Sequence, residues 1–124
     1  MKARILVIED VREMADLIGL YLGGEGMEVD SCPTGEEGLE RFRSSRFDLV
    51  VLDINLPGMD GFEFLQHLRR ESAVPVVIVS ARDADEDMVL GLGIGADEFV
   101  TKPFSPKVLV ARIRAVLRRT TELR

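Results

Sequence analysis

The sequence predicts an α/β domain in which five strands alternate with five helices, giving a doubly wound (βα)5 parallel sheet. Short runs rich in β-branched residues alternate with longer segments whose apolar residues recur at helical spacing. Three of the short runs are apolar through their middle, as strands must be when helices cover both faces of a sheet. Such alternation forms parallel strands with right-handed crossovers, and we take the strand order to be 2-1-3-4-5.

Each expected strand is a short apolar or β-branched run. Residues 4–8, 48–53 and 74–80 are the three runs that stay apolar through their middle. Residues 28–32 and 98–101 are more polar or shorter, and they complete the set of five strands.

The helices between these strands begin and end at residues suited to those positions. Thr34 is a suitable N-cap, and Pro106 suits the first turn of the last helix. Gly23, Gly24 and Gly26 are expected to stop the first helix. The expected helices cover approximately residues 14–22, 34–42, 60–70, 84–94 and 106–117.

Length and composition exclude several classes of protein. A chain of 124 residues with 46% hydrophobic residues fits one folded domain. The net charge of −6 argues against nucleic-acid binding by this domain itself. One cysteine, Cys32, and one histidine, His67, leave a zinc site or a disulfide poorly supported. No apolar run approaches the ~20 residues of a membrane span, so we expect a cytoplasmic protein with no membrane partner.

Polar side chains stand where the expected strands end. Glu9 and Asp10 follow the first strand, and Asp53 ends the third. Ser80 ends the fourth strand and Lys102 follows the fifth. In an open parallel sheet, binding sites lie beyond these carboxyl ends, where the strand order reverses. Each residue alone would be an ordinary cap, turn or surface residue, but their joint placement indicates a site.

The carboxylates of this set favour a divalent cation. Carboxylates on neighbouring strands repel each other, and Mg2+ relieves that repulsion with a few carboxylates, waters and phosphate oxygens. We expect Asp10 and Asp53 to bind Mg2+ directly and Glu9 to act through water. The backbone carbonyl of Asn55 completes the expected metal site.

The same set suits phosphoryl transfer, in which catalysis is mostly positioning and placement of charge. Asp53 is placed to attack phosphorus, since carboxylates form acyl phosphates. Lys102 would bear on the charge of the phosphoryl oxygens, and Ser80 would donate a hydrogen bond to one of them.

These residues resemble the response-regulator receiver family over essentially all of residues 2–119. Residues 111–119 resemble its OmpR/PhoB-type subfamily, whose members carry a winged-helix DNA-binding domain after the receiver. We expect residues 1–119 to form a receiver domain and residues 120–124 to begin a linker toward an output domain absent from the chain. The matching segments are residues 5–10, 48–53, 56–61, 76–81 and 95–104.

The resemblance implies a flavodoxin-like fold and a signalling domain rather than an enzyme. A histidine kinase would transfer a phosphoryl group from its phosphohistidine to Asp53 with Mg2+. Ser80 would then turn toward the phosphoryl group, and Phe99 would swing inward. The bond between Lys102 and Pro103 is expected to be cis, as in the family.

The resemblance also implies a change at the surface formed by residues 84–94, 98–101 and 106–119. Phosphorylation would favour a symmetric homodimer through this surface, and DNA would be bound only through the absent C-terminal domain. Two positions that usually form an ion pair across the dimer are here Met88 and Val108. An apolar contact is expected to replace that pair; the alternative is a surface that does not dimerise.

Charge pairs and a glycine are expected to affect the change that phosphorylation causes at this surface. The remaining charge pairs across the dimer are expected to be Glu98–Arg112 and Asp97–Arg114. Interior glycines weaken a helix, so Gly93 predicts that the helix over residues 84–94 is locally weak.

Three other functions fit the residues less well. An aspartyl-phosphoenzyme phosphatase would need an Asp-x-Asp pair, whereas residue 55 is Asn55 in the run that begins at Asp53. A flavodoxin-like cofactor binder would need a phosphate-binding loop after the first strand, where Glu9 and Asp10 would repel a phosphate. A stand-alone receiver remains open, and the intact acidic set argues against a receiver that is never phosphorylated.

Overall fold

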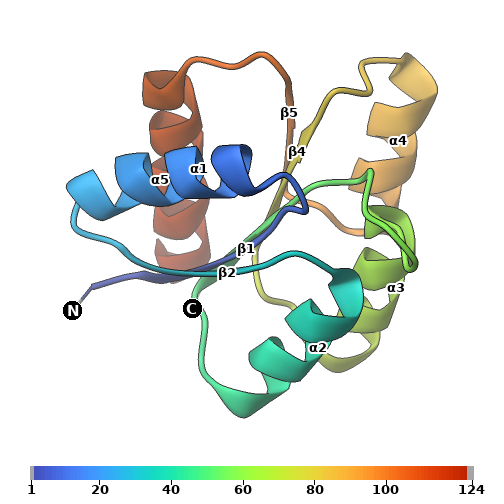
Figure 1. Cartoon of the computed structure of the whole chain (residues 1–124), viewed down its shortest axis with the longest axis horizontal. Helices are drawn as coiled ribbons and strands as arrows, with labels where there is room; N and C mark the ends of the chain where they lie inside the picture. Colours follow the sequence, from blue (N-terminus) through green and yellow to red (C-terminus); the bar gives the residue numbers. More distant parts are fainter. Residues whose placement is uncertain (1, 123–124) are drawn as a thin grey trace.

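The computed structural model describes residues 2–122 and contains five strands and five helices in alternation (Figure 1). The predicted α/β class is therefore confirmed. The strands are β1 (Arg4–Ile8), β2 (Glu28–Cys32), β3 (Leu49–Leu52), β4 (Val76–Ser80) and β5 (Glu98–Thr101). The helices are α1 (Arg12–Gly24), α2 (Gly35–Ser44), α3 (Gly61–Glu71), α4 (Asp85–Ile94) and α5 (Pro106–Glu122).

The strands form one parallel sheet in the order β2-β1-β3-β4-β5, which confirms the predicted order. β1 lies between β2 and β3, so the direction in which strands are added reverses beside β1 and β3. In the pairing of these two strands, Ile8 lies opposite Leu52 at the carboxyl end of each. The residues that follow the two strands therefore emerge side by side.

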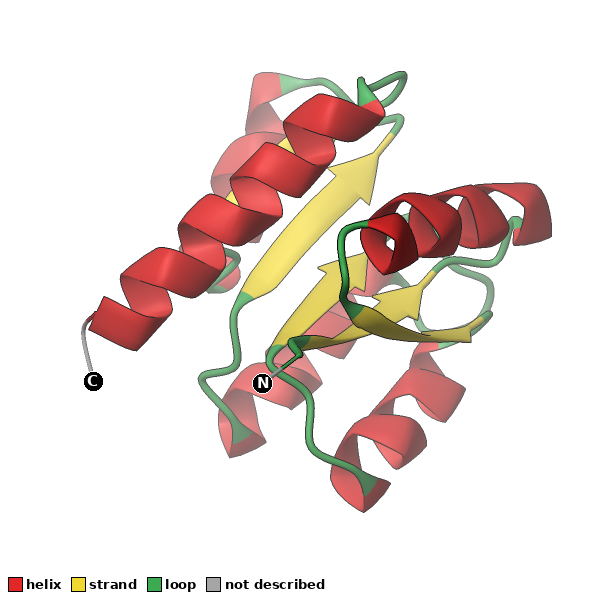
Figure 2. Ribbon diagram, turned by 90° about the vertical axis from the view of Figure 1, so that its left-hand side faces the viewer, coloured by secondary structure: helices red, strands yellow, loops and turns green. Residues whose placement is uncertain are grey.

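Helices cover both faces of this sheet (Figure 2). α1 and α5 lie together on one face, whereas α2, α3 and α4 lie on the other (Figure 1). Leu6 and Ile8 enter the core beneath α2 and α3, and Ile5 and Val7 enter the core beneath α1 and α5. All four side chains are fully buried, as the continuous apolar run of this strand predicts.

Helix ends follow the predicted capping residues with small differences. Thr34 Oγ1 accepts a hydrogen bond from Glu37 N (3.1 Å) and caps α2, which ends at residue 44 rather than 42. α1 does not stop before Gly23 but continues through Gly24, and Gly26 follows it with φ of +85°. The predicted stop was early because a glycine weakens a helix without necessarily ending it.

α4 buries little of its apolar surface. Gly91 is its buried residue, whereas Val89, Leu90 and Leu92 are 71%, 48% and 47% exposed. This helix therefore presents apolar side chains to solvent.

α5 continues through Glu122, so residues 120–122, which were expected to begin a linker, are helical. Residues 123–124 of that expected linker lie outside the described residues. The Lys102–Pro103 peptide bond is cis, as the family resemblance implies. Over residues 2–122, each helix is too short or too polar to cross a membrane.

Candidate functional site

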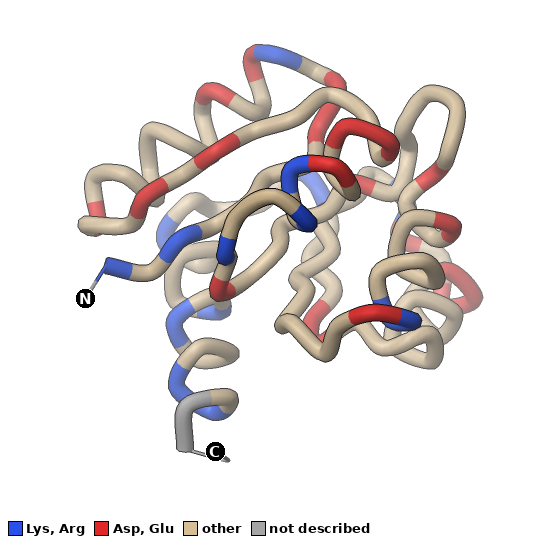
Figure 3. Tube along the Cα trace, turned by 90° about the horizontal axis from the view of Figure 1, so that it is seen from below, with Lys and Arg blue, Asp and Glu red and all other residues tan. Residues whose placement is uncertain are grey.

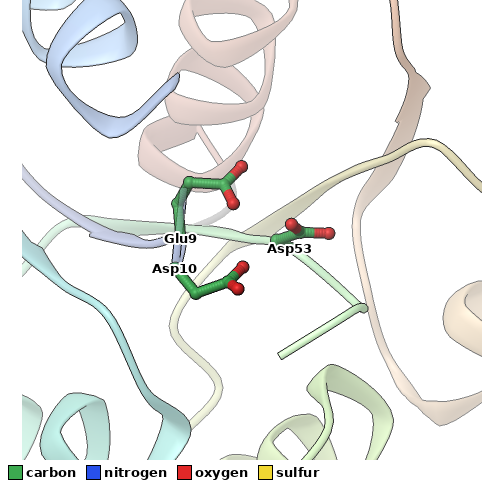
Figure 4. Close-up of side chains that lie close together, drawn as sticks. All are labelled: Glu9, Asp10 and Asp53. Atoms are coloured by element: carbon green, nitrogen blue, oxygen red, sulfur yellow. The ribbon is translucent and has the colours of Figure 1, made fainter. Parts of the chain in front are cut away.

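Three carboxylates meet at the carboxyl edge of the sheet (Figure 4). Glu9 and Asp10 follow β1, and Asp53 follows β3. Asp53 N donates a hydrogen bond to Ile8 O (3.0 Å), which holds the two strand ends together. One carboxylate oxygen from each of the three acids lies within 4.8 Å of the others. Adjacent parallel strands that end in register thus bring the predicted acids into one cluster.

Glu9 is the most enclosed of the three acids, with 3% of its surface exposed. Its Oε1 accepts a hydrogen bond from Lys102 Nζ (2.7 Å), and its Oε2 accepts one from Val11 N (3.3 Å). Burial raises the pKa of Glu9 to about 7; the Asp53 carboxylate adds to the rise and Lys102 opposes it. Both oxygens of Glu9 thus accept hydrogen bonds within the protein, and its role toward a metal through water stays a prediction.

Asp53 is 5% exposed, and donors hold both of its carboxylate oxygens. Oδ1 accepts a hydrogen bond from Asn55 N (3.1 Å), and Oδ2 accepts one from Lys102 Nζ (3.3 Å). The start of α3 approaches closely, because a Cβ at Gly61 would lie 2.5 Å from Asp53 O. The β3–α3 loop and Lys102, which follows β5, therefore set the direction in which the Asp53 carboxylate points.

Lys102 follows β5, the outermost strand on its side of the sheet, and its side chain extends past β4 to the acids. Its backbone N donates to Ser80 O (2.7 Å), which holds the end of β5 beside the end of β4. Burial by itself lowers the pKa of Lys102, but the hydrogen bond to Glu9 and the charge of Asp53 outweigh burial and leave the pKa raised. The side chain is therefore an ammonium ion at neutral pH and bridges two carboxylates.

The donor set fits a hard divalent cation. Asp10 is exposed, and its carboxylate points toward the same space as that of Asp53 (Figure 4). Two carboxylates, completed by waters and phosphate oxygens, are the ligands that Mg2+ prefers. Burial is the main cause of the raised pKa of Glu9, and the nearby Asp53 carboxylate, whose charge a cation would offset, adds to it. Asp10 and Asp53 are the residues that could hold the ion directly.

Ser80, the last residue of β4, and Asn55, in the β3–α3 loop, lie beside the cluster. Ser80 is fully buried, and its Oγ accepts a hydrogen bond from Arg82 N (3.1 Å). Asn55 Oδ1 accepts one from Arg82 Nε (2.8 Å). Metal binding by the Asn55 carbonyl stays a prediction. The bond between the side chains of Arg82 and Asn55 was not foreseen, because the two residues are 27 positions apart and share no sequence signal.

Known proteins share the sequence of this chain. The family model for the response regulator receiver domain matches residues 5–114. The DNA-binding response regulator MtrA of Mycolicibacterium smegmatis is 45% identical over 122 residues, which cover 98% of this chain and 54% of MtrA. The sensory transduction protein RegX3 of the same organism is 47% identical over 115 residues, which cover 93% of this chain and 50% of RegX3. The chain thus spans about half the length of these curated relatives.

Solved structures share its fold. A CheY-like response regulator receiver domain protein from Methanospirillum hungatei matches with a TM-score of 0.94 and 30% identity, covering 100% of both chains. The BeF3-activated N-terminal receiver domain of RstA from Klebsiella pneumoniae matches with a TM-score of 0.89 and 38% identity, covering 93% of this chain and 98% of that one. The family resemblance and the flavodoxin-like fold are confirmed: this chain belongs to the response regulator receiver domain family.

Proposed function

We propose that this chain is the phosphoacceptor domain of a two-component response regulator and that Asp53 takes the phosphoryl group from a histidine kinase. One observation carries the proposal. Asp53 is a buried carboxylate that accepts a hydrogen bond from the ammonium group of Lys102 and lies in one cluster with Glu9 and Asp10. This arrangement offers a nucleophile, a cation and metal ligands at one point.

The transfer itself needs positioning and charge more than covalent machinery. An oxygen of Asp53 attacks the phosphorus of a phosphohistidine, and a P–O bond forms as the P–N bond breaks. The imidazole leaves with the electron pair and takes up a proton. Lys102 Nζ, 3.3 Å from Asp53 Oδ2, stays beside the growing negative charge. The Ser80 hydroxyl accepts from Arg82 N and still has a proton to donate to a phosphoryl oxygen.

The proposed metal is Mg2+, held directly by Asp10, Asp53 and the carbonyl of Asn55. Its contribution when bound is to offset the charge of the carboxylates and of the phosphoryl oxygens. Glu9 would act through water while it holds Lys102 Nζ at 2.7 Å. The ammonium group is thereby kept aligned with Asp53.

The proposed output is a change at the α4–β5–α5 face that favours a symmetric homodimer. Support comes from apolar side chains exposed there, among them Leu92 at 47% and Val108 at 44%. Figure 3 shows Lys and Arg recurring along the helix that leads to the C-terminus, whereas α4 begins with acidic residues. Opposite charges on two helices suit a two-fold interface in which α4 of each copy faces α5 of the other.

DNA binding would belong to an output domain outside this chain. Two observations support this part of the proposal. The relatives are about twice as long as the region they share with this chain, and MtrA is named a DNA-binding response regulator. The net charge of −6 gives the present domain no general attraction for nucleic acid.

Phosphorylation by a small-molecule donor tests the proposal without the kinase. With Mg2+ and acetyl phosphate, the chain should gain the mass of one phosphoryl group, and hydroxylamine should remove it because acyl phosphates react with hydroxylamine. Asp53→Asn should gain no such mass, whereas Asp60→Asn, which removes the carboxylate that caps α3, should gain it as before. An adduct on another residue, or one that resists hydroxylamine, would contradict the proposal.

A further inference from the structure

Arg82 connects three parts of the structure beside the acidic cluster. Its Nε donates to Asn55 Oδ1 (2.8 Å) in the β3–α3 loop, and its Nη1 lies 3.5 Å from Asp87 Oδ1 in the first turn of α4. Its guanidinium carbon lies 5.7 Å from the centroid of the Phe62 ring in α3, within range of a cation–π contact. One side chain therefore spans the β3–α3 loop, α3 and α4.

These contacts form a continuous path from Asp53 to α4. Asp53 Oδ1 accepts a hydrogen bond from Asn55 N, and Asn55 Oδ1 accepts one from Arg82 Nε. Arg82 in turn pairs with Asp87. The guanidinium thus lies two hydrogen bonds away from a carboxylate oxygen of Asp53.

The first turn of α4 has few other anchors. Its N-cap residue, Ala84, has no side-chain oxygen to accept hydrogen bonds from the first amides. The buried residue of the helix, Gly91, lies toward its other end. Within the described residues, the pair between Arg82 and Asp87 is the ion pair that holds this turn. Loss of that pair would therefore act directly on the start of α4.

We propose that Asp87 and the phosphoryl group compete for Arg82, so that phosphorylation of Asp53 withdraws the guanidinium from α4 and loosens its first turn. This inference rests on the proposed function, because it requires a phosphoryl group on Asp53. The phosphoryl group adds negative charge and acceptor oxygens close to Asn55. A guanidinium binds phosphoryl oxygens in a matched fork geometry, which favours them over one distant carboxylate.

The pair that must break is weak. The side chains of Arg82 and Asp87 are 41% and 24% exposed, and Arg82 Nη1 lies 3.5 Å from Asp87 Oδ1. Exposed ion pairs of this kind contribute little, corresponding to about a two- to fivefold change in an equilibrium constant. The competition can therefore be decided by the charge that phosphorylation adds.

Competition predicts that removing Asp87 and removing Arg82 change the affinity for a phosphoryl analogue in opposite directions. Removing Asp87 leaves Arg82 available to the phosphoryl group and should strengthen binding of a phosphoryl analogue. Removing Arg82 should weaken that binding, because binding and the ion pair are linked. A side chain that only supported the loop would weaken binding in both variants.

Titration with beryllofluoride, a phosphoryl analogue, in the presence of Mg2+ measures these affinities by 19F NMR. Asp87→Asn should bind about two- to fivefold more tightly than the unaltered chain, and Arg82→Gln should bind more weakly. Glu86→Gln is the matched control, because it removes a charge from the same turn and leaves the Arg82–Asp87 pair in place. Equal or weaker binding by Asp87→Asn, relative to Glu86→Gln, overturns the proposal.

Hydrogen exchange at Met88 gives a second readout, since Met88 N donates to Ala84 O in this turn. In the unaltered chain, beryllofluoride should speed exchange of the Met88 amide. In Asp87→Asn, this amide should already exchange faster without beryllofluoride, and adding the analogue should change its rate little. If the proposed function fails, beryllofluoride binds neither the unaltered chain nor any variant through Asp53. If the analogue binds and Met88 exchanges equally in all variants, the proposed function stands and the competition for Arg82 is wrong.

Discussion

Replacing Gly93 by alanine should stabilise the protein, whereas the same change at Gly91 should destabilise it, although both glycines lie in α4. A Cβ added at Gly93 meets no heavy atom of the described residues within 4 Å. A Cβ added at Gly91 would lie 2.7 Å from Ile78 Cδ1 and 3.4 Å from Phe99 Cδ2. The structure therefore predicts opposite outcomes for one chemical change made two residues apart.

The size of each effect follows from helix propensity and packing. Glycine inside a helix costs about 1 kcal/mol relative to alanine, so Gly93→Ala should raise the unfolding free energy by about 0.5–1 kcal/mol. With 124 residues and an unfolding entropy of about 2.1 cal/mol/K per residue, Tm should rise by about 2–4 °C. Gly91→Ala forces neighbouring side chains to move, which costs about 1–3 kcal/mol and should lower Tm by about 4–12 °C.

Thermal unfolding followed by circular dichroism measures both changes, and hydrogen exchange locates them. In the unaltered chain, amides of α4 should exchange faster than those of α1, and Gly93→Ala should slow them. A Gly93→Ala chain with an unchanged or lower Tm would show that position 93 is not an open helix position. Exchange in α4 as slow as in α1 would refute its local weakness.

Four further measurements test the site and the output face. Lys102→Met leaves Glu9 and Asp53 without their shared cation, so urea titration should show a loss of about 1–3 kcal/mol in the metal-free chain; an equal unfolding free energy would contradict the bridge. Because the folded chain raises the pKa of Glu9 from 4.5 to about 7, it binds the extra proton between these values, and its unfolding free energy should fall as pH rises through that window. The Mg2+ affinity measured by calorimetry should rise over the same pH window. If a Glu9→Gln chain kept the pH dependence of both the unfolding free energy and the Mg2+ affinity, another group would be responsible for them. In sedimentation, Met88→Glu should weaken dimerisation of the beryllofluoride-bound chain about tenfold or more. Leu20→Glu on α1, at a position 73% exposed, should not weaken it. Equal dimerisation constants for Met88→Glu and the unaltered chain would contradict an apolar contact at this position.

The order of secondary structure was predictable because its signals are local. The strand over residues 28–32 and the cap at Thr34 each depend on residue types within a few positions. Burial of β1 on both faces follows from a continuous apolar run. Helix ends were less certain, as Gly23 and Gly24 show, because a glycine lowers the stability of a helical turn without fixing where the helix ends.

The acidic edge was predictable for a related reason. Parallel strands joined by right-handed crossovers send all their carboxyl ends to one side, so residues that follow different strands must gather there. Glu9, Asp10 and Asp53 could therefore be brought together without coordinates. Their roles toward metal and phosphate depend on chemistry that the proposed experiments address.

The sequence alone thus determined the alternation of elements and the edge where the acids gather, and the tertiary structure decided which side chains are partners. The pairing of Asp97 with Arg114 across a dimer stays a prediction; within the chain, Asp97 Oδ2 accepts from Val76 N (2.8 Å) and lies 3.5 Å from Arg69 Nη2. Within the chain, Arg114 Nη2 lies 2.7 Å from Oε1 of Glu25, the residue that follows α1. Exposed ion pairs differ in free energy by about 1 kcal/mol or less, so the distances between packed elements select among them, and no local pattern records those distances.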